Sequence, residues 1–124
     1  MRGAAIADYD GDGDLDFLIP ANPTGNTLDL YLFTNDGTDH FTNTGIVATT
    51  ATGSGGGFGM TAGDFNHDGN ADLLISRNGA NVVVGLGDGT GHFTVSEVNT
   101  GVGNGRGMDV ADFDHDGHLD FVRA

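Results

Sequence analysis

The chain has 124 residues, of which 23 are glycine and none is cysteine, so it has the size of one domain and can form no disulfide or thiolate metal site. Its formal net charge is −14, from 18 acidic against 4 basic residues, which argues against nucleic acid or an anionic membrane surface as a partner. The sequence has no run of about 18 apolar residues, so we expect no membrane insertion, and no signal peptide is visible.

One sequence element occurs three times along the chain. It reads RGAAIADYDGDGDLDFLI at residues 2–19, FGMTAGDFNHDGNADLLI at 58–75 and RGMDVADFDHDGHLDFV at 106–122. A second element follows the first two copies, as LYLFTNDGTDHFT at 30–42 and VVVGLGDGTGHFT at 82–94. The repeats differ in length at 20–27 and 49–57, which we expect to be loops, because repeat scaffolds accept insertions there.

The apolar runs of the first repeat predict four strands in chain order, at residues 4–7, 17–19, 28–33 and 41–47. The last two flank an Asp-Gly pair, which is typical of a β-hairpin turn. Two hairpins in a repeat of about 50 residues are the unit of a β-propeller blade, and a β-solenoid ranks second because its repeats are shorter. We therefore predict an all-β chain of four-stranded antiparallel blades, with blade 1 at about 1–56, blade 2 at about 57–104 and a half-blade at 105–124.

Between the first two strands of each repeat lies an acidic loop of the form Asp-x-Asp/Asn-x-Asp-Gly-x-x-Asp. Calcium takes six to eight oxygen ligands, and a loop that curls around it presents alternate side chains to the ion. Glycine at position 6 suits the sharp turn, and position 7 offers its backbone carbonyl. We predict three Ca²⁺ sites in preference to Mg²⁺, which keeps more waters. The predicted ligand positions 1, 3, 5, 7 and 9 are Asp8, Asp10, Asp12, Asp14 and Asp16; Asp64, Asn66, Asp68, Asn70 and Asp72; and Asp112, Asp114, Asp116, His118 and Asp120.

Two other kinds of loop fit this sequence less well than a calcium loop of this form. An EF-hand requires a glutamate at position 12, where this chain has Ile19, Ile75 and Arg123. Ordinary Asp-Gly turns would explain one loop but not three copies with the same polar positions. The aromatic residues at position 2 are predicted to pack in the core. His67 and His115, at position 4, are predicted to be solvated, with a second metal site as the alternative.

These loops, together with the following hairpins, resemble the FG-GAP/VCBS repeats, the blades of integrin-α-like β-propellers. The segment 57–59, Gly-Phe-Gly, is similar to the Phe-Gly part of that family's motif, whereas the other two copies have Arg-Gly at 2–3 and 106–107. The resemblance implies that each acidic loop joins two strands of a blade and holds one calcium ion in a structural role.

Two and a half blades do not close a propeller of four to eight blades. We expect the chain to be completed by further blades of a longer chain or by copies of itself, in a ring or a filament. The sequence contains no known catalytic motif. The predicted function is a non-catalytic, extracellular, calcium-stabilised module for binding or adhesion, with a glycan or protein ligand. The alternatives are a self-assembling structural subunit and a lectin-like carbohydrate-binding protein.

Overall fold

The computed structural model describes residues 3–21, 27–51, 59–77, 81–101 and 107–124. Those ranges contain ten β-strands and no helix, so no helix there is long and apolar enough to cross a membrane. The strands are β1 (Ala5–Ala7), β2 (Asp16–Ala21), β3 (Thr27–Asn35), β4 (Phe41–Ala51), β5 (Met60–Gly63), β6 (Asp72–Ser76), β7 (Asn81–Gly87), β8 (Phe93–Asn99), β9 (Met108–Ala111) and β10 (Asp120–Arg123).

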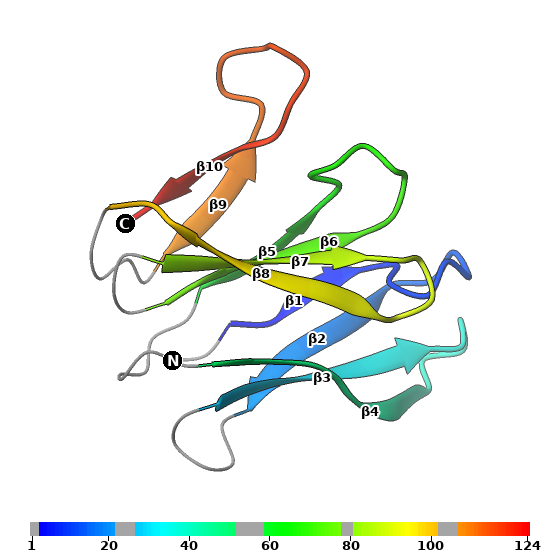
Figure 1. Cartoon of the computed structure of the whole chain (residues 1–124). Helices are drawn as coiled ribbons and strands as arrows, with labels where there is room; N and C mark the ends of the chain where they lie inside the picture. The colour runs from blue at the N-terminus through cyan, green and yellow to red at the C-terminus, as the bar shows by residue number, and fades with distance from the viewer. Residues whose placement is uncertain (1–2, 22–26, 52–58, 78–80, 102–106) are drawn as a thin grey trace.

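The strands form three separate sheets whose order follows the sequence (Figure 1). The first sheet is β1-β2-β3-β4 and the second is β5-β6-β7-β8, while β9 and β10 form a two-stranded hairpin. Every pairing is antiparallel. The predicted all-β fold of four-stranded blades in an unclosed arrangement is therefore confirmed.

The strands of the first sheet are longer than their apolar runs predicted. Strand β2 continues through Pro20, which pairs with Leu30 of β3, although residues 20–27 were expected to be a loop. Strand β1 pairs with β2 only from Asp16 to Leu18. Pro20 therefore lies where β2 has no neighbour on that side among the described residues, and proline is tolerated at such an edge. Residues 22–26 and 52–58, with most of the two expected insertions and the Phe of the Phe-Gly motif, lie outside the described residues.

The main hydrophobic core lies between the two four-stranded sheets. Alternate residues of β2 and β3 point to the same face of the first sheet, and Leu18, Leu28, Leu30 and Leu32 are buried there. Across from them lie the buried residues Leu73, Ile75 and Val83 of the second sheet, in the same cluster. Strand β6 is buried at every residue. This burial fits the apolar run at 73–75, because a strand covered on both faces does not alternate apolar with polar residues.

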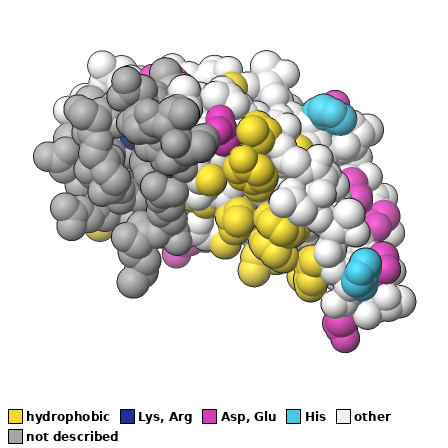
Figure 2. Space-filling model, turned by 90° about the horizontal axis from the view of Figure 1, so that it is seen from below, with side chains coloured by type: hydrophobic (Ala, Val, Ile, Leu, Met, Phe, Trp, Pro, Cys, Tyr) yellow, Lys and Arg dark blue, Asp and Glu magenta, His cyan; other side chains and the backbone are white. Residues whose placement is uncertain are grey.

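The other face of the first sheet carries an exposed aromatic cluster. The rings of Phe17 and Phe33 are stacked with centroids 4.7 Å apart, and Phe41 lies against Phe17 at 5.1 Å. Phe41 is 44% exposed and Ile6, from β1, is 63% exposed. Figure 2, which views the molecule from the side of this sheet, shows hydrophobic side chains gathered into a patch.

Tyr9, at position 2 of the first acidic loop, joins the two sheets. Its ring is buried and meets Phe93 of β8 edge to face, with centroids 5.5 Å apart. Its hydroxyl is buried without a hydrogen-bond partner among the described residues, and this burial, with the charge of Asp16, raises the pKa of the phenol well above its usual value. The core role predicted for position 2 is wrong for Phe113, which is 53% exposed. The described residues include no further sheet that covers Phe113 as β8 covers Tyr9.

We expect Tyr9→Ala to lower the free energy of unfolding by about 3–5 kcal/mol, because it empties a packed site between the sheets. Tyr9→Phe keeps the ring and removes a buried hydroxyl that has no partner, so it should leave stability unchanged or raise it by up to about 1 kcal/mol. Urea unfolding followed by circular dichroism measures both. A clear loss of stability in Tyr9→Phe would show that the hydroxyl does have a partner.

Candidate metal centre

The three acidic loops share one backbone shape, which requires left-handed residues at two positions. They join β1 to β2, β5 to β6 and β9 to β10, and in Figure 1 they follow one another along the same side of the molecule. At position 6, the three glycines have φ of 97°, 87° and 92°. At position 4, Gly11 has φ 79°, His67 φ 60° and His115 φ 63°. The sequence predicted the left-handed turn at position 6 but not the left-handed residue at position 4. The only sequence signal for position 4 is Gly11, because glycine adopts positive φ readily.

Position 1 holds the turn of each loop together through both oxygens of its carboxylate. One oxygen accepts the backbone N–H of the glycine at position 6, at 2.9 Å for Asp8 and 3.0 Å for Asp64 and Asp112. The other oxygen of Asp8 accepts the N–H of Gly11 at 2.7 Å, whereas in the other two loops it accepts that of position 5 at 3.1 Å. The backbone therefore curls around this side chain, with later loop residues brought close to it.

Position 9 anchors the loop to the rest of its sheet. Asp16 and Asp72 are both 0% exposed. Asp16 accepts the N–H of Tyr9 at 2.8 Å and that of Asn35, at the end of β3, at 2.9 Å. Asp72 repeats this arrangement with Phe65 at 2.8 Å and Gly87, at the end of β7, at 2.9 Å. One buried carboxylate thus connects the acidic loop to the second hairpin of the same blade.

The third loop has the first of these two bonds. Asp120 accepts the N–H of Phe113, at position 2 of its loop, at 3.1 Å. Asp16 and Asp72 make the same bond to position 2 of their own loops. Its sheet contains only β9 and β10, so the described residues include no strand equivalent to β3 or β7. Asp120 is accordingly more exposed than Asp16 and Asp72.

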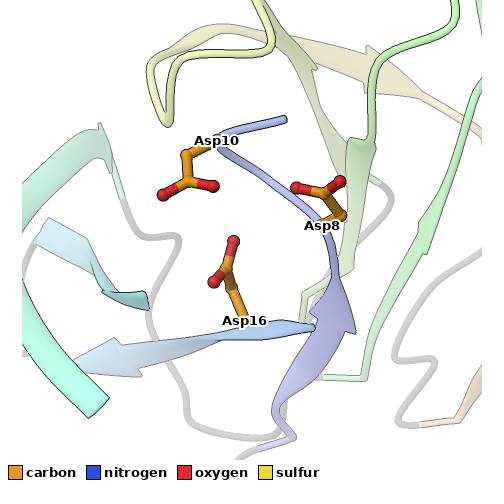
Figure 3. Close-up of side chains that lie close together, drawn as sticks. All are labelled: Asp8, Asp10 and Asp16. Atoms are coloured by element: carbon orange, nitrogen blue, oxygen red, sulfur yellow. The ribbon is translucent and has the colours of Figure 1, made fainter. Parts of the chain in front are cut away.

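Two groups of carboxylates come together closely enough to share a metal ion. Oxygens of Asp8, Asp10 and Asp16 all lie within 4.8 Å of one another, as do those of Asp112, Asp114 and Asp116. Figure 3 shows the first group, in which Asp8 just after β1, Asp10 in the loop and Asp16 at the start of β2 face a common space. The other predicted ligands of these two loops lie outside the groups, namely Asp12, Asp14, His118 and Asp120. Asp12 instead accepts the N–H of Asp14 at 2.9 Å. Among the described residues, the second loop forms no such group of carboxylates.

The second loop has an amide where the other loops have a carboxylate at position 3. The side-chain amide of Asn66 donates to Asp68 at 2.8 Å, and its oxygen accepts the N–H of Asp68 at 3.0 Å. The backbone N–H of Asn70, followed by the Asn66 amide, lowers the pKa of Asp68. This loop therefore reduces its own charge repulsion with internal hydrogen bonds.

The side chains at position 7 point away from the carboxylate groups. A Cβ atom built on Gly37 would lie 2.6 Å from Oδ2 of Asp14, and one on Gly89 would lie 2.5 Å from Oδ1 of Asn70. Asp14 and Asn70 thus cover the turns of the second hairpins, which leaves their backbone carbonyls as the groups that can face an ion. His118 contacts His67 of the second loop instead.

Charge crowding is strongest in the first loop. Burial raises the pKa of Asp10, and the neighbouring charges of Asp16, Asp12 and Asp8 raise it further, against the lowering effect of the Asp12 N–H. The charged form of Asp10 is thus disfavoured in the absence of an ion. A divalent cation held among these oxygens would reverse the sign of that local potential.

The fold and these loops define a repeat protein of β-propeller-type blades whose first hairpin carries an acidic loop. Comparison with known families agrees: the model of the FG-GAP-like repeat matches residues 8–75 and 73–122. The chain belongs to the FG-GAP-like repeat family. No curated protein matches the sequence significantly.

The buried carboxylate at position 9 can be tested without metal. Asp72→Asn keeps one acceptor oxygen but turns an N–H₂ group toward a backbone N–H, so we expect it to lower the free energy of unfolding in EDTA by about 2–3 kcal/mol. The matched control is Asp39→Asn, because Asp39 is exposed and asparagine tolerates its φ of 61°. Equal urea midpoints for the two variants would contradict the anchoring role.

Proposed function

We propose that this chain is a calcium-stabilised module whose three acidic loops each hold one Ca²⁺. The observation that carries the proposal is the convergence of Asp8, Asp10 and Asp16 on one space without neutralisation by a described arginine. Arg77 donates to Glu97 at 2.6 Å and Arg123 donates to Thr100 at 3.3 Å. Carboxylate and carbonyl oxygens in such a loop are the ligands that calcium prefers.

Calcium at the first loop would stabilise more than the loop itself, because the loop also forms part of the contact between the two sheets. The N–H of Gly91, in the turn before β8, donates to the carbonyl of Tyr9 at 2.9 Å, and the Tyr9 ring packs on Phe93. An ion that fixes the loop therefore fixes the surface on which β8 packs. Binding to the folded state alone adds to the free energy of folding.

The biological role that we propose is non-catalytic binding or adhesion outside the cell. Membership of the FG-GAP-like family supports a propeller module, and calcium sites in extracellular modules suit the millimolar calcium found there. The carboxylates are used in loop hydrogen bonds and in the proposed ion sites, so we assign them no reaction. The ligand is a glycan or a protein, and binding to a glycan array would support the lectin-like alternative.

Calcium removal is the direct test. We expect the melting temperature to fall in EDTA, since each site occupied at 100 times its Kd contributes about 2.7 kcal/mol to stability. Asp10→Asn should shrink the difference between calcium and EDTA while raising stability in EDTA, because it removes one of the crowded charges. Asp39→Asn should leave both melting curves unchanged. Superimposable curves of the parent protein in calcium and EDTA would rule out the proposal.

The aromatic patch supports a second proposal, self-association. Within the chain, the first sheet packs its apolar inner face on the second sheet, so blades of this type cover one another face to face. The outer face, with Phe17, Phe33 and Phe41, is apolar too. At the other end of the array, Phe121 and Val122 are exposed. We propose that these two surfaces meet between copies of the chain, head to tail.

We expect light scattering in calcium to give a molar mass above that of one chain, with a lower mass in EDTA. Phe41→Ser should reduce the mass by weakening the aromatic cluster. Val98→Ser is the control, because Val98 is an equally exposed apolar residue on β8. A parent protein that is monomeric in calcium would overturn self-association and leave the calcium proposal standing.

A further inference from the structure

Two histidines from different repeats meet on the surface. His67 occupies position 4 of the second acidic loop and His118 position 7 of the third. Nε2 of His67 lies 3.0 Å from Nδ1 of His118, and the ring centroids are 5.0 Å apart with planes at 60°. Both side chains are exposed, so the pair is open to solvent.

The spacing of these nitrogens matches that of two ligands on one metal ion. Imidazole nitrogens bind zinc at 2.0–2.1 Å, and two of them at 90–110° around one ion would lie about 2.9–3.4 Å apart. Both side chains are exposed, so small rotamer changes can aim the two nitrogens at one ion. A hydrogen bond between the rings uses one nitrogen as donor, whereas an ion uses both as acceptors.

Both histidines are held by backbone that the acidic loops have already fixed. His67, with a left-handed φ of 60°, directly precedes Asp68 and Gly69, whose N–H groups donate to Asp64. The N–H of His118 donates to Asp116 at 2.8 Å. Binding would therefore order little more than two side-chain rotamers, which keeps the entropic cost small.

We propose that His67 and His118 form a binding site for a divalent transition-metal ion that prefers imidazole, such as Cu²⁺ or Ni²⁺. The site differs in chemistry from the acidic loops, because calcium takes oxygen ligands. Among the described residues, no third His, Asp or Glu atom completes a close group with the pair, so water or an incoming ligand occupies the other positions. The ion bridges the second sheet and the hairpin of β9 and β10.

The experiment titrates Cu²⁺ into the protein in excess calcium, with electron paramagnetic resonance as the readout. Hyperfine splitting from coordinated nitrogen distinguishes imidazole from carboxylate ligands. We expect one Cu²⁺ with two nitrogen ligands, and His67→Asn or His118→Asn to weaken binding at least about tenfold by removing one of two donors. The matched control is His115→Asn, since His115 has the same loop position as His67 and nearly the same φ of 63°.

The outcomes separate this site from the calcium loops. Asparagine tolerates positive φ, so His67→Asn should keep the melting temperature of the parent protein in calcium and lose only the nitrogen signal. A parent spectrum with oxygen ligands alone would overturn the proposal, as would binding that His67→Asn leaves intact. Equal weakening by His115→Asn would also overturn it, because the copper would then be held by surface histidines in general. None of these results depends on whether calcium stabilises the fold.

Discussion

The buried aspartate at position 9 is the interaction on which each blade depends. Asp16 and Asp72 have no exposed surface, and a carboxylate in that position must be matched by hydrogen bonds or an ion. The backbone supplies two N–H groups, one from the loop and one from the end of the third strand. These bonds hold the acidic loop and the second hairpin together, although the two are separated in sequence. The remaining oxygen lone pairs of Asp16 stay available to an ion beside Asp8 and Asp10.

The same loop also determines how blades pack on each other. Its position 2 side chain leaves the acidic side and enters the core, where Tyr9 meets Phe93 of the next sheet. The backbone carbonyl of Tyr9 accepts the N–H of Gly91. Gly91 has a left-handed φ of 82°, and a Cβ atom there would lie 2.9 Å from Cδ2 of Leu32, so a side chain would be strained and would displace Leu32. The carboxylates of Asp8 and Asp10 and the core ring of Tyr9 are thus consecutive in the chain. A change in the charge of the loop therefore also affects the packing between the two blades.

Local sequence signals predicted most of this fold, because strand alternation, Asp-Gly turns and the glycine at position 6 each depend on near neighbours. Contacts between residues far apart in the sequence could not be predicted from such local signals. The continuation of β2 through Pro20 depends on where β1 begins, because Ala5 pairs with Leu18. The N–H groups of Asn35 and Gly87 reach their aspartates from 19 and 15 residues away. The exposure of Phe113 depends on whether another sheet covers it, as β8 covers Tyr9. The contact of His67 with His118 spans 51 residues, and no periodicity within one repeat encodes it.

The three copies of the loop show which positions can vary without loss of its shape. Positions 1 and 9 are aspartate in every copy, and each accepts a backbone N–H group of its own loop in every copy. Positions 4 and 7 differ between copies, since position 4 requires only a left-handed backbone and position 7 directs its side chain away from the carboxylates. Side chains at these two positions are therefore free to acquire contacts of their own. His67 and His118 occupy one of each, and a metal-binding pair could arise there without disturbing either acidic loop.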